Sequence, residues 1–211
     1  SLKVSVNPSS WMEAAFTEFY EQAYQKSDYY EYFEGNVRDV IERVQKGQDD
    51  LGFVYLLKEQ SASAQFLMRK YQLQFEPLKK IQLMLYGGKK VEQFPPENGE
   101  LRLIQGSQTE VRPEDVLRLG AIEGISLESP QTAVTTNSGS LLRHLLEHSD
   151  LWNLSSESLN GTYSGTEGIL LEGKENEVVF GCVSRNEEQL GELEKEFIAY
   201  VKKKLGDSKK E

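Results

Sequence analysis

Two short polar runs follow apolar strands near the amino end of the chain, and both could bind a small ligand. Ser9 and Ser10 follow the strand predicted at Leu2–Val6, and Gly35 and Asn36 follow the next one. Each run precedes an amphipathic pattern, so it marks a helix N-terminus. A helix N-terminus presents unpaired N–H groups and a partial positive charge, which bind anions and polar groups. The pattern predicts a pocket for a small ligand without any catalytic residue.

The elements that position these runs are predicted by the spacing of apolar residues. Valine and isoleucine recur at helical spacing between Asn36, as the N-cap, and Gly47, the residue that follows the helix. An earlier helix is expected over residues 11–25, a strand at residues 31–33, and another strand at Leu51–Leu57. The order strand, helix, strand, helix, strand is typical of two βαβ crossovers in a parallel sheet.

The middle of the chain gives weaker signals. Residues 87–113 hold Gly-Gly and Pro-Pro pairs and few consecutive apolar residues, so we expect a surface connector there. We expect strands at residues 121–127 and 133–135 and a helix at residues 141–146. Strong signals return with a central strand at residues 178–183.

A final helix follows that strand. Ser184 and Glu187 have the spacing of a capping box, which predicts the start of this helix. Its apolar residues at helical spacing are Leu190, Leu193, Phe197, Val201 and Leu205.

The composition excludes several classes of protein. The 211 residues carry a formal net charge of -10, which disfavours binding to phosphate backbones and to anionic membranes. Cys182 is the single cysteine, so no internal disulfide can form and a cytoplasmic protein is favoured. No apolar run approaches the ~20 residues of a membrane span. We expect a cytoplasmic protein that does not itself bind DNA or membranes and needs no cofactor.

Four stretches of sequence, in order along the chain, carry a resemblance to a known family. They are residues 34–55, which hold Glu-Gly-Asn and the helix and strand that follow, residues 75–78 (Phe-Glu-Pro-Leu), residues 112–115 (Arg-Pro-Glu-Asp) and residues 179–186 (Val-Phe-Gly-Cys-Val-Ser-Arg-Asn). The chain resembles the effector-binding, or regulatory, domain of LysR-type transcriptional regulators. In that family, the same order of motifs spans the whole domain.

The resemblance implies an α/β fold of two Rossmann-like subdomains joined by two crossover strands, like that of type 2 periplasmic binding proteins. Subdomain I would comprise residues 1–80 and 167–211, and subdomain II residues 81–166. A small polar or anionic metabolite would bind in the interdomain cleft and change the geometry of a homodimer. The full-length protein would be a tetramer that binds DNA through an amino-terminal winged helix-turn-helix, which this chain lacks. Exposed apolar positions on the first helix and on the helix at residues 141–146 are candidates for the dimer face.

The candidate ligand-binding residues come from both predicted subdomains. They are Ser9, Ser10, Trp11, Gly35, Asn36, Tyr55, Thr135, Thr136, Asn137 and Ser138. Tyr55 ends its strand at the carboxyl edge, where open α/β sheets bind ligands, although its ring could simply pack. Ser10 could act only as the cap of its own helix, and Trp11 fits a core anchor better than a stacking surface. The run from Thr135 to Ser138 lies where this family reaches the ligand with a hydroxyl, and it could also be an ordinary polar turn.

Two other functional classes stay open. A solute-binding protein of a membrane transporter shares the two-lobe architecture, and an enzyme on the same fold would need a charged catalytic cluster. His144 and His148 are one helical turn apart, a spacing that can bind a metal, but the sequence offers no third ligand. We therefore predict no metal site and no enzymatic activity.

Overall fold

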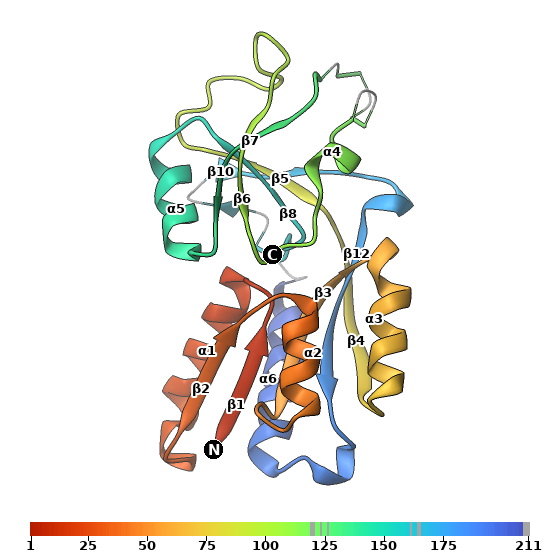
Figure 1. The fold of residues 1–211 in the computed structure, drawn as a ribbon. Helices are drawn as coiled ribbons and strands as arrows, with labels where there is room; N and C mark the ends of the chain where they lie inside the picture. Colours follow the sequence, from red (N-terminus) through yellow and green to blue (C-terminus); the bar gives the residue numbers. More distant parts are fainter. Residues whose placement is uncertain (119–120, 123, 126, 161, 164–165, 209–211) are drawn as a thin grey trace. The chain divides into compact units, whose positions relative to one another are not determined.

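The chain forms two α/β units, which are shown in Figure 1. The computed structural model describes residues 1–118, 121–122, 124–125, 127–160, 162–163 and 166–208. Unit 1 consists of Ser1–Lys80 and Val179–Glu211, and unit 2 of Ile81–Val178. The chain leaves unit 1 within one strand and returns to it within another, so the predicted α/β fold with two crossover strands is confirmed. Unit 1 resumes at Val179.

Unit 1 is built on a five-stranded sheet with the order β2-β1-β3-β12-β4. The strands are β1 (Leu2–Val6), β2 (Tyr30–Glu34), β3 (Leu51–Leu57), β4 (Gln74–Gln82) and β12 (Glu177–Ser184). Strand β1 pairs in parallel with both β2 and β3, as the sequence predicts. The carboxyl ends of these three strands therefore meet at one edge of the sheet.

Helices cover both faces of this sheet. They are α1 (Ser10–Ala23), which continues as the 3₁₀ helix η1 (Tyr24–Lys26), α2 (Val37–Gln45), α3 (Lys58–Lys70) and α6 (Glu192–Ser208). On β12, Phe180 packs against Trp11 of α1, while Val183 packs with α2 and α3. An odd separation along a strand puts side chains on opposite faces. Helices α1 and α6 therefore cover one face, and α2 and α3 cover the other (Figure 1).

Helix α2 has the predicted boundaries for the predicted reasons. The Asn36 side chain accepts a hydrogen bond from the Asp39 N–H, and the Asp39 carboxylate accepts one from the Asn36 N–H, which makes a capping box. Gly47 follows the helix with φ +75°, a conformation that favours glycine. On β3, a Cβ at Gly52 would lie 2.5 Å from Val40 Cγ1, so glycine lets α2 pack closely against the sheet.

Unit 2 is built on a second five-stranded sheet with the order β11-β5-β8-β6-β7. Its strands are β5 (Met84–Gly87), β6 (Arg102–Gly106), β7 (Gln131–Thr136), β8 (Trp152–Ser155) and β11 (Ile169–Leu170), beside the pair β9 (Thr162–Tyr163) and β10 (Thr166–Glu167). Its helices are α4 (Pro113–Val116), α5 (Gly139–His148) and the 3₁₀ helix η2 (Lys174–Asn176). Strand β6 runs parallel to β7 and β8, and α5 packs through Leu146 against Ile104 and Leu151.

Two predictions for the middle of the chain are wrong. The supposed connector at residues 87–113 contains β6, whose Leu103 and Ile104 are fully buried. The described part of residues 121–127 forms bends and a turn rather than a strand, because Gly124 adopts φ +76°. A left-handed glycine interrupts an extended backbone.

The predicted start of the last helix is also wrong. Ser184 is still part of β12, and Asn186 instead caps a short 3₁₀ helix, η3 (Glu187–Gln189). Leu190 is extended, and α6 begins only at Glu192. No helix that the structure describes, α6 included, is long and apolar enough to cross a membrane.

Candidate functional site

The side chain of Asn7 joins the ends of three strands in unit 1. Its Nδ2 donates a hydrogen bond to the Gly35 carbonyl oxygen (3.1 Å), and its Oδ1 accepts one from the Tyr55 N–H (2.8 Å). Its own N–H donates to the carbonyl oxygen of Phe53 (3.0 Å). Asn7 is not among the residues predicted from the sequence, although a polar residue directly after a buried strand was a signal for it.

Ser9 and Tyr55 form a buried pair of hydroxyl groups at the same edge. Ser9 Oγ and the Tyr55 hydroxyl share a hydrogen bond of 2.7 Å, and Ser9 Oγ also accepts one from the Met12 N–H (3.0 Å). Ser9 is therefore the N-cap of α1, which corrects the prediction that Ser10 caps it. Ser10 is the first helical residue and is half-buried. The Tyr55 ring also packs, with its centroid 4.7 Å from that of Phe180.

The N-terminus of α2 lies at this edge too. Gly35 is buried, and a Cβ there would lie 2.9 Å from Asp39 Cβ and from Phe33 Cε1. Because Asn36 Oδ1 is used by the cap, its amide Nδ2 is the donor that a ligand could contact. The structure thus brings the predicted residues of the first half together at one sheet edge, around Asn7. We call this group the unit 1 half-site.

Trp11 belongs to the core rather than to an open surface. It is 2% exposed, with its ring edge-on to Phe180 at 5.8 Å. Lys204 Nζ lies 5.4 Å from the Trp11 ring centroid and 3.0 Å from both carboxylate oxygens of Glu18. The hydrogen bond from Tyr200 to Glu18 lowers the pKa of Glu18, and burial together with this bond raises the pKa of Tyr200 to about 12.

The predicted residues of the second half lie in the turn between β7 and α5. Ser138 is the N-cap of α5, because its Oγ accepts a hydrogen bond from the Leu141 N–H (3.1 Å). Thr136 Oγ1 accepts one from the Ser138 N–H (3.0 Å), while Thr135 and Asn137 are exposed. We call these four residues, from Thr135 to Ser138, the unit 2 half-site. Two of them shape the turn, and the other two present polar side chains to solvent.

A buried amide pair lies next to this turn and was also missed. Gln105, in register with Thr135, accepts a hydrogen bond at Oε1 from the Leu154 N–H (2.9 Å) and donates one from Nε2 to the Leu154 carbonyl oxygen (3.1 Å). Asn153 Nδ2 donates to the Ile104 carbonyl oxygen (2.9 Å). These side chains replace strand-to-strand hydrogen bonds between β6 and β8, and they fix the carboxyl end of β6.

The chemistry of both half-sites is that of hydrogen bonding. The ten predicted residues carry hydroxyls, amides and helix N-termini but no charged side chain, which suits a polar or anionic ligand. His144 and His148 are exposed on α5. Among the described residues, no three His, Cys, Asp or Glu side chains are grouped as a metal site.

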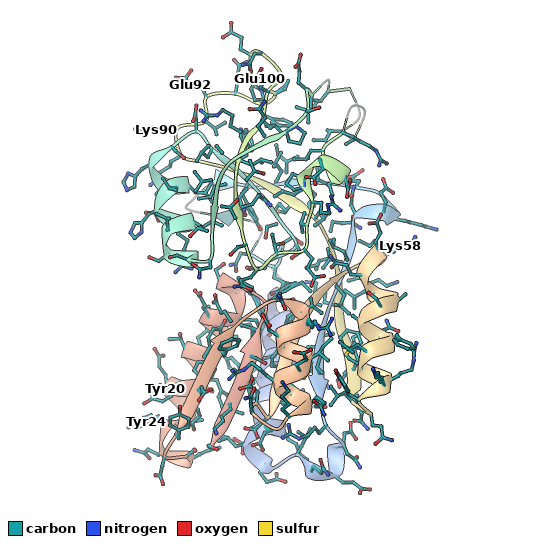
Figure 2. All side chains as sticks on the ribbon, in the orientation of Figure 1. Tyr20, Tyr24, Lys58, Lys90, Glu92 and Glu100 are labelled. Carbon is teal, nitrogen blue, oxygen red and sulfur yellow. The ribbon has the colours of Figure 1, made fainter. Side chains whose placement is uncertain are left out.

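Two surface hollows contain none of the ten predicted residues. One, of about 440 Å³, lies within unit 1, and the other, of about 390 Å³, lies within unit 2. The unit 2 hollow includes Lys90, Glu92 and Glu100, which Figure 2 labels. Its lining mixes both signs of charge.

Solved structures share this fold over nearly the whole chain. The C-terminal domain of a probable LysR family transcriptional regulator from Rhodococcus sp. RHA1 is 18% identical, with a TM-score of 0.59, and the match covers 95% of this chain and 97% of that one. The regulatory domain of CcmR from Synechocystis PCC6803, in complex with 2-PG, is 14% identical, with a TM-score of 0.61 and coverage of 97% and 96%. The chain has the fold of a LysR-type effector-binding domain.

A third structure agrees with this assignment. The effector-binding domain of QuiR in complex with shikimate is 12% identical, with a TM-score of 0.55 and coverage of 98% of this chain and 97% of that one. No protein-family model matches the sequence, and the search of curated proteins finds no significant match. In this LysR-type fold, both half-sites lie at the carboxyl ends of parallel strands, where open α/β sheets bind ligands.

Proposed function

We propose that this chain is the effector-sensing domain of a LysR-type transcriptional regulator that acts in the cytoplasm. The two half-sites together bind one small polar or anionic metabolite, and they catalyse no reaction. Binding changes the geometry of a homodimer, because the ligand stabilises one of its arrangements over another. DNA is bound by a separate winged helix-turn-helix, and the full-length protein is a tetramer.

The observation that carries this proposal is the concentration of uncharged hydrogen-bonding groups at one sheet edge. The Ser9 and Tyr55 hydroxyls, the Asn36 amide and the N-termini of α1 and α2 meet where β1, β2 and β3 end. Such an arrangement can bind and release a ligand, whereas acyl or proton transfer needs a nucleophile or an acid and base in contact. The ligands of the QuiR and CcmR domains support sensing as the role of this fold.

An exposed aromatic patch supports the homodimer. Tyr20, Tyr24 and Tyr29 are 46%, 51% and 51% exposed, and we call them the tyrosine patch. They lie on α1, on η1 and just before β2, which is an edge strand of its sheet; Figure 2 labels the first two. Exposed aromatic side chains beside an unpaired strand edge favour association with another chain. Sedimentation should show a dimer that Tyr20→Ser with Tyr24→Ser weakens, while the control Phe66→Ser, on exposed α3 surface, does not.

A thermal-shift screen against metabolites, with shikimate and 2-PG included, tests the sensing role. A ligand of the half-sites raises the melting temperature in a concentration-dependent way. Ser10→Ala and Thr136→Ala each remove one hydroxyl, so each should weaken binding by about fivefold, the value of one hydrogen bond.

The matched control is Thr132→Ala, at the opposite end of β7 from Thr136, which should bind the ligand with unchanged affinity. If Ser10→Ala and Thr136→Ala also leave the affinity unchanged, the site assignment is refuted. If a ligand that binds the domain leaves the DNA affinity of the full-length regulator unchanged, the sensing role is refuted.

A further inference from the structure

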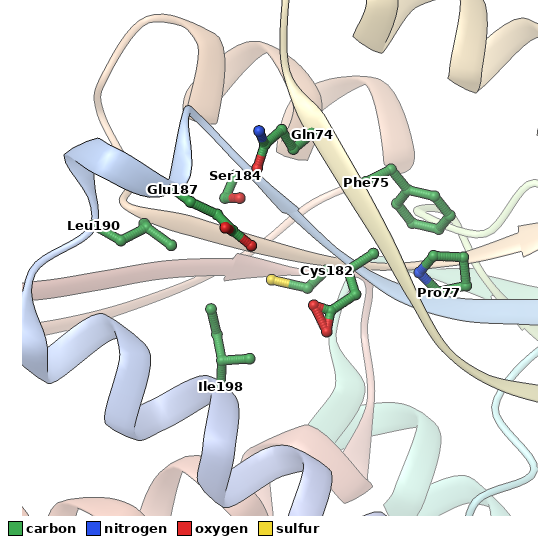
Figure 3. A pocket seen from close by; sticks show the side chains of 9 residues that line it. Gln74, Phe75, Pro77, Cys182, Ser184, Glu187, Leu190 and Ile198 are labelled. Carbon is green, nitrogen blue, oxygen red and sulfur yellow. The ribbon is translucent and has the colours of Figure 1, made fainter.

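The hollow in unit 1 lies against the outer strands of the sheet, and Figure 3 shows it from close by. Its volume of about 440 Å³ is within the range of small-molecule sites. Its lining includes Gln74, Glu76, Ser184, Glu187, Leu190 and Ile198. None of the residues that line the hollow belongs to either half-site, so the hollow is distinct from the proposed effector site.

The position of α6 explains why this face stays open. Phe197 of α6 packs against Phe53 of β3, with ring centroids 5.6 Å apart, so the helix is anchored over the middle of the sheet. Strands β12 and β4 lie beyond β3, and α6 reaches them with Ile198 at the rim of the hollow. Because side chains alternate along a strand, Cys182 and Ser184 share the face of β12 that forms the floor.

A buried polar group on this floor points to a ligand. Ser184 is 8% exposed, and its hydroxyl has no hydrogen-bond partner among the residues that the structure describes. The hydroxyl lines the hollow, so a ligand in the hollow can form a hydrogen bond with it. The neighbouring Cys182 thiol is 3% exposed, and burial raises its pKa, so it stays protonated and neutral.

The charge around the hollow is negative. Glu76 forms an ion pair with Lys202, so its charge is largely compensated. Glu187 is exposed on η3, lines the hollow and has no ion-pair partner in the described ranges of the chain (Figure 3). Among the residues with a described position, no lysine or arginine lines the hollow. A bound cation would therefore meet one uncompensated carboxylate.

We propose that this hollow is a second ligand site, which binds a small primary alkylamine in its ammonium form. The ammonium group donates hydrogen bonds to the Glu187 carboxylate and to Ser184 Oγ, with the Gln74 side-chain oxygen as a further acceptor. The alkyl body packs against Leu190 and Ile198. Both parts of the ligand are needed, because an exposed ion pair alone is weak.

Isothermal titration calorimetry gives a direct readout of occupancy. Binding is measured with n-pentylamine, and with pentanoate at the same ionic strength. The amine should bind in a saturable way, while pentanoate should not. Equal effects of the two compounds, or no effect of the amine, would overturn the proposal.

Variants test which groups bind the amine. Glu187→Gln should weaken binding of the amine by about fivefold, the value of an exposed ion pair. The matched control is Glu188→Gln, which removes the same charge from the next residue of η3 and should not change the affinity. Ser184→Ala, which keeps every charge, should also weaken it by about fivefold. If Glu187→Gln and Glu188→Gln behave alike, the charge recognition is refuted.

Discussion

Replacing Asn7 with alanine tests how the three strand ends of the unit 1 half-site are joined. The change leaves the Tyr55 N–H without an acceptor and the Gly35 carbonyl without a donor, and both groups are buried. An unpaired buried polar group costs about 1–3 kcal/mol, so we expect Asn7→Ala to lose about 3 kcal/mol of unfolding free energy. The same change should weaken any ligand of the half-site, because Gly35 and Tyr55 are no longer fixed.

Guanidinium denaturation of unit 1 measures this loss. Trp11 lies in unit 1 and Trp152 in unit 2, so a Trp152→Phe background lets fluorescence report on unit 1 alone. Asn137→Ala is the matched control, since Asn137 is exposed and its replacement should cost less than about 0.5 kcal/mol. A loss below about 1 kcal/mol for Asn7→Ala would show that the strand ends are held by other contacts.

Three further predictions concern packing and charge in unit 1. Gly52→Ala should lose about 1–3 kcal/mol of unfolding free energy, because its Cβ would lie 2.5 Å from Val40 Cγ1. Adding Val40→Ala should restore part of that loss. Denaturation of the two single variants and the double variant checks this. Ser5→Ala should keep or raise stability by up to about 1 kcal/mol, because the fully buried Ser5 hydroxyl has no partner among the described residues; a melting temperature well below that of the parent would contradict this. Glu18→Gln should lower stability by less than about 1 kcal/mol at neutral pH, since Glu18 is partly exposed. The folded-state pKa of Glu18 is lowered, chiefly by the hydrogen bond from Tyr200. The stability that Glu18 contributes is therefore present above the pKa of an unfolded glutamate and disappears as the pH falls through the folded-state pKa. A stability difference between the parent and Glu18→Gln that grows on acidification would refute this prediction.

Local signals were enough to predict much of unit 1. Helix α2 has a cap, an apolar stripe and a terminal glycine within residues 36–47, and each of them acts locally. Strand β3 is buried on both faces and reads as a continuous apolar run. Where sequence and structure agree, the residues that define the element are neighbours in the chain.

The missed features depend on partners far along the chain. Strand β6 contains Gln105, a polar residue that a central strand accommodates because Leu154, 49 residues away, supplies its hydrogen bonds. Asn7 looks like an ordinary loop residue until Gly35 and Tyr55, 28 and 48 residues away, are placed beside it. The strand predicted near Gly124 failed for the opposite reason, because one backbone conformation outweighed an apolar pattern. Pairings of this kind are set by tertiary structure, which a single sequence does not specify.

The position of β12 between β3 and β4 has a consequence for biosynthesis. In the described part of the chain, strand β4 joins the sheet of unit 1 only through β12, and nearly all of unit 2 separates these two strands in the sequence. During translation, β4 therefore leaves the ribosome long before its partner, and the edge of β3 stays open until residues 177–184 follow. Such long-range pairing is slow and leaves strand edges exposed to other chains. A nascent chain released before β12 should aggregate, so the last strand decides whether the first half of the protein becomes soluble.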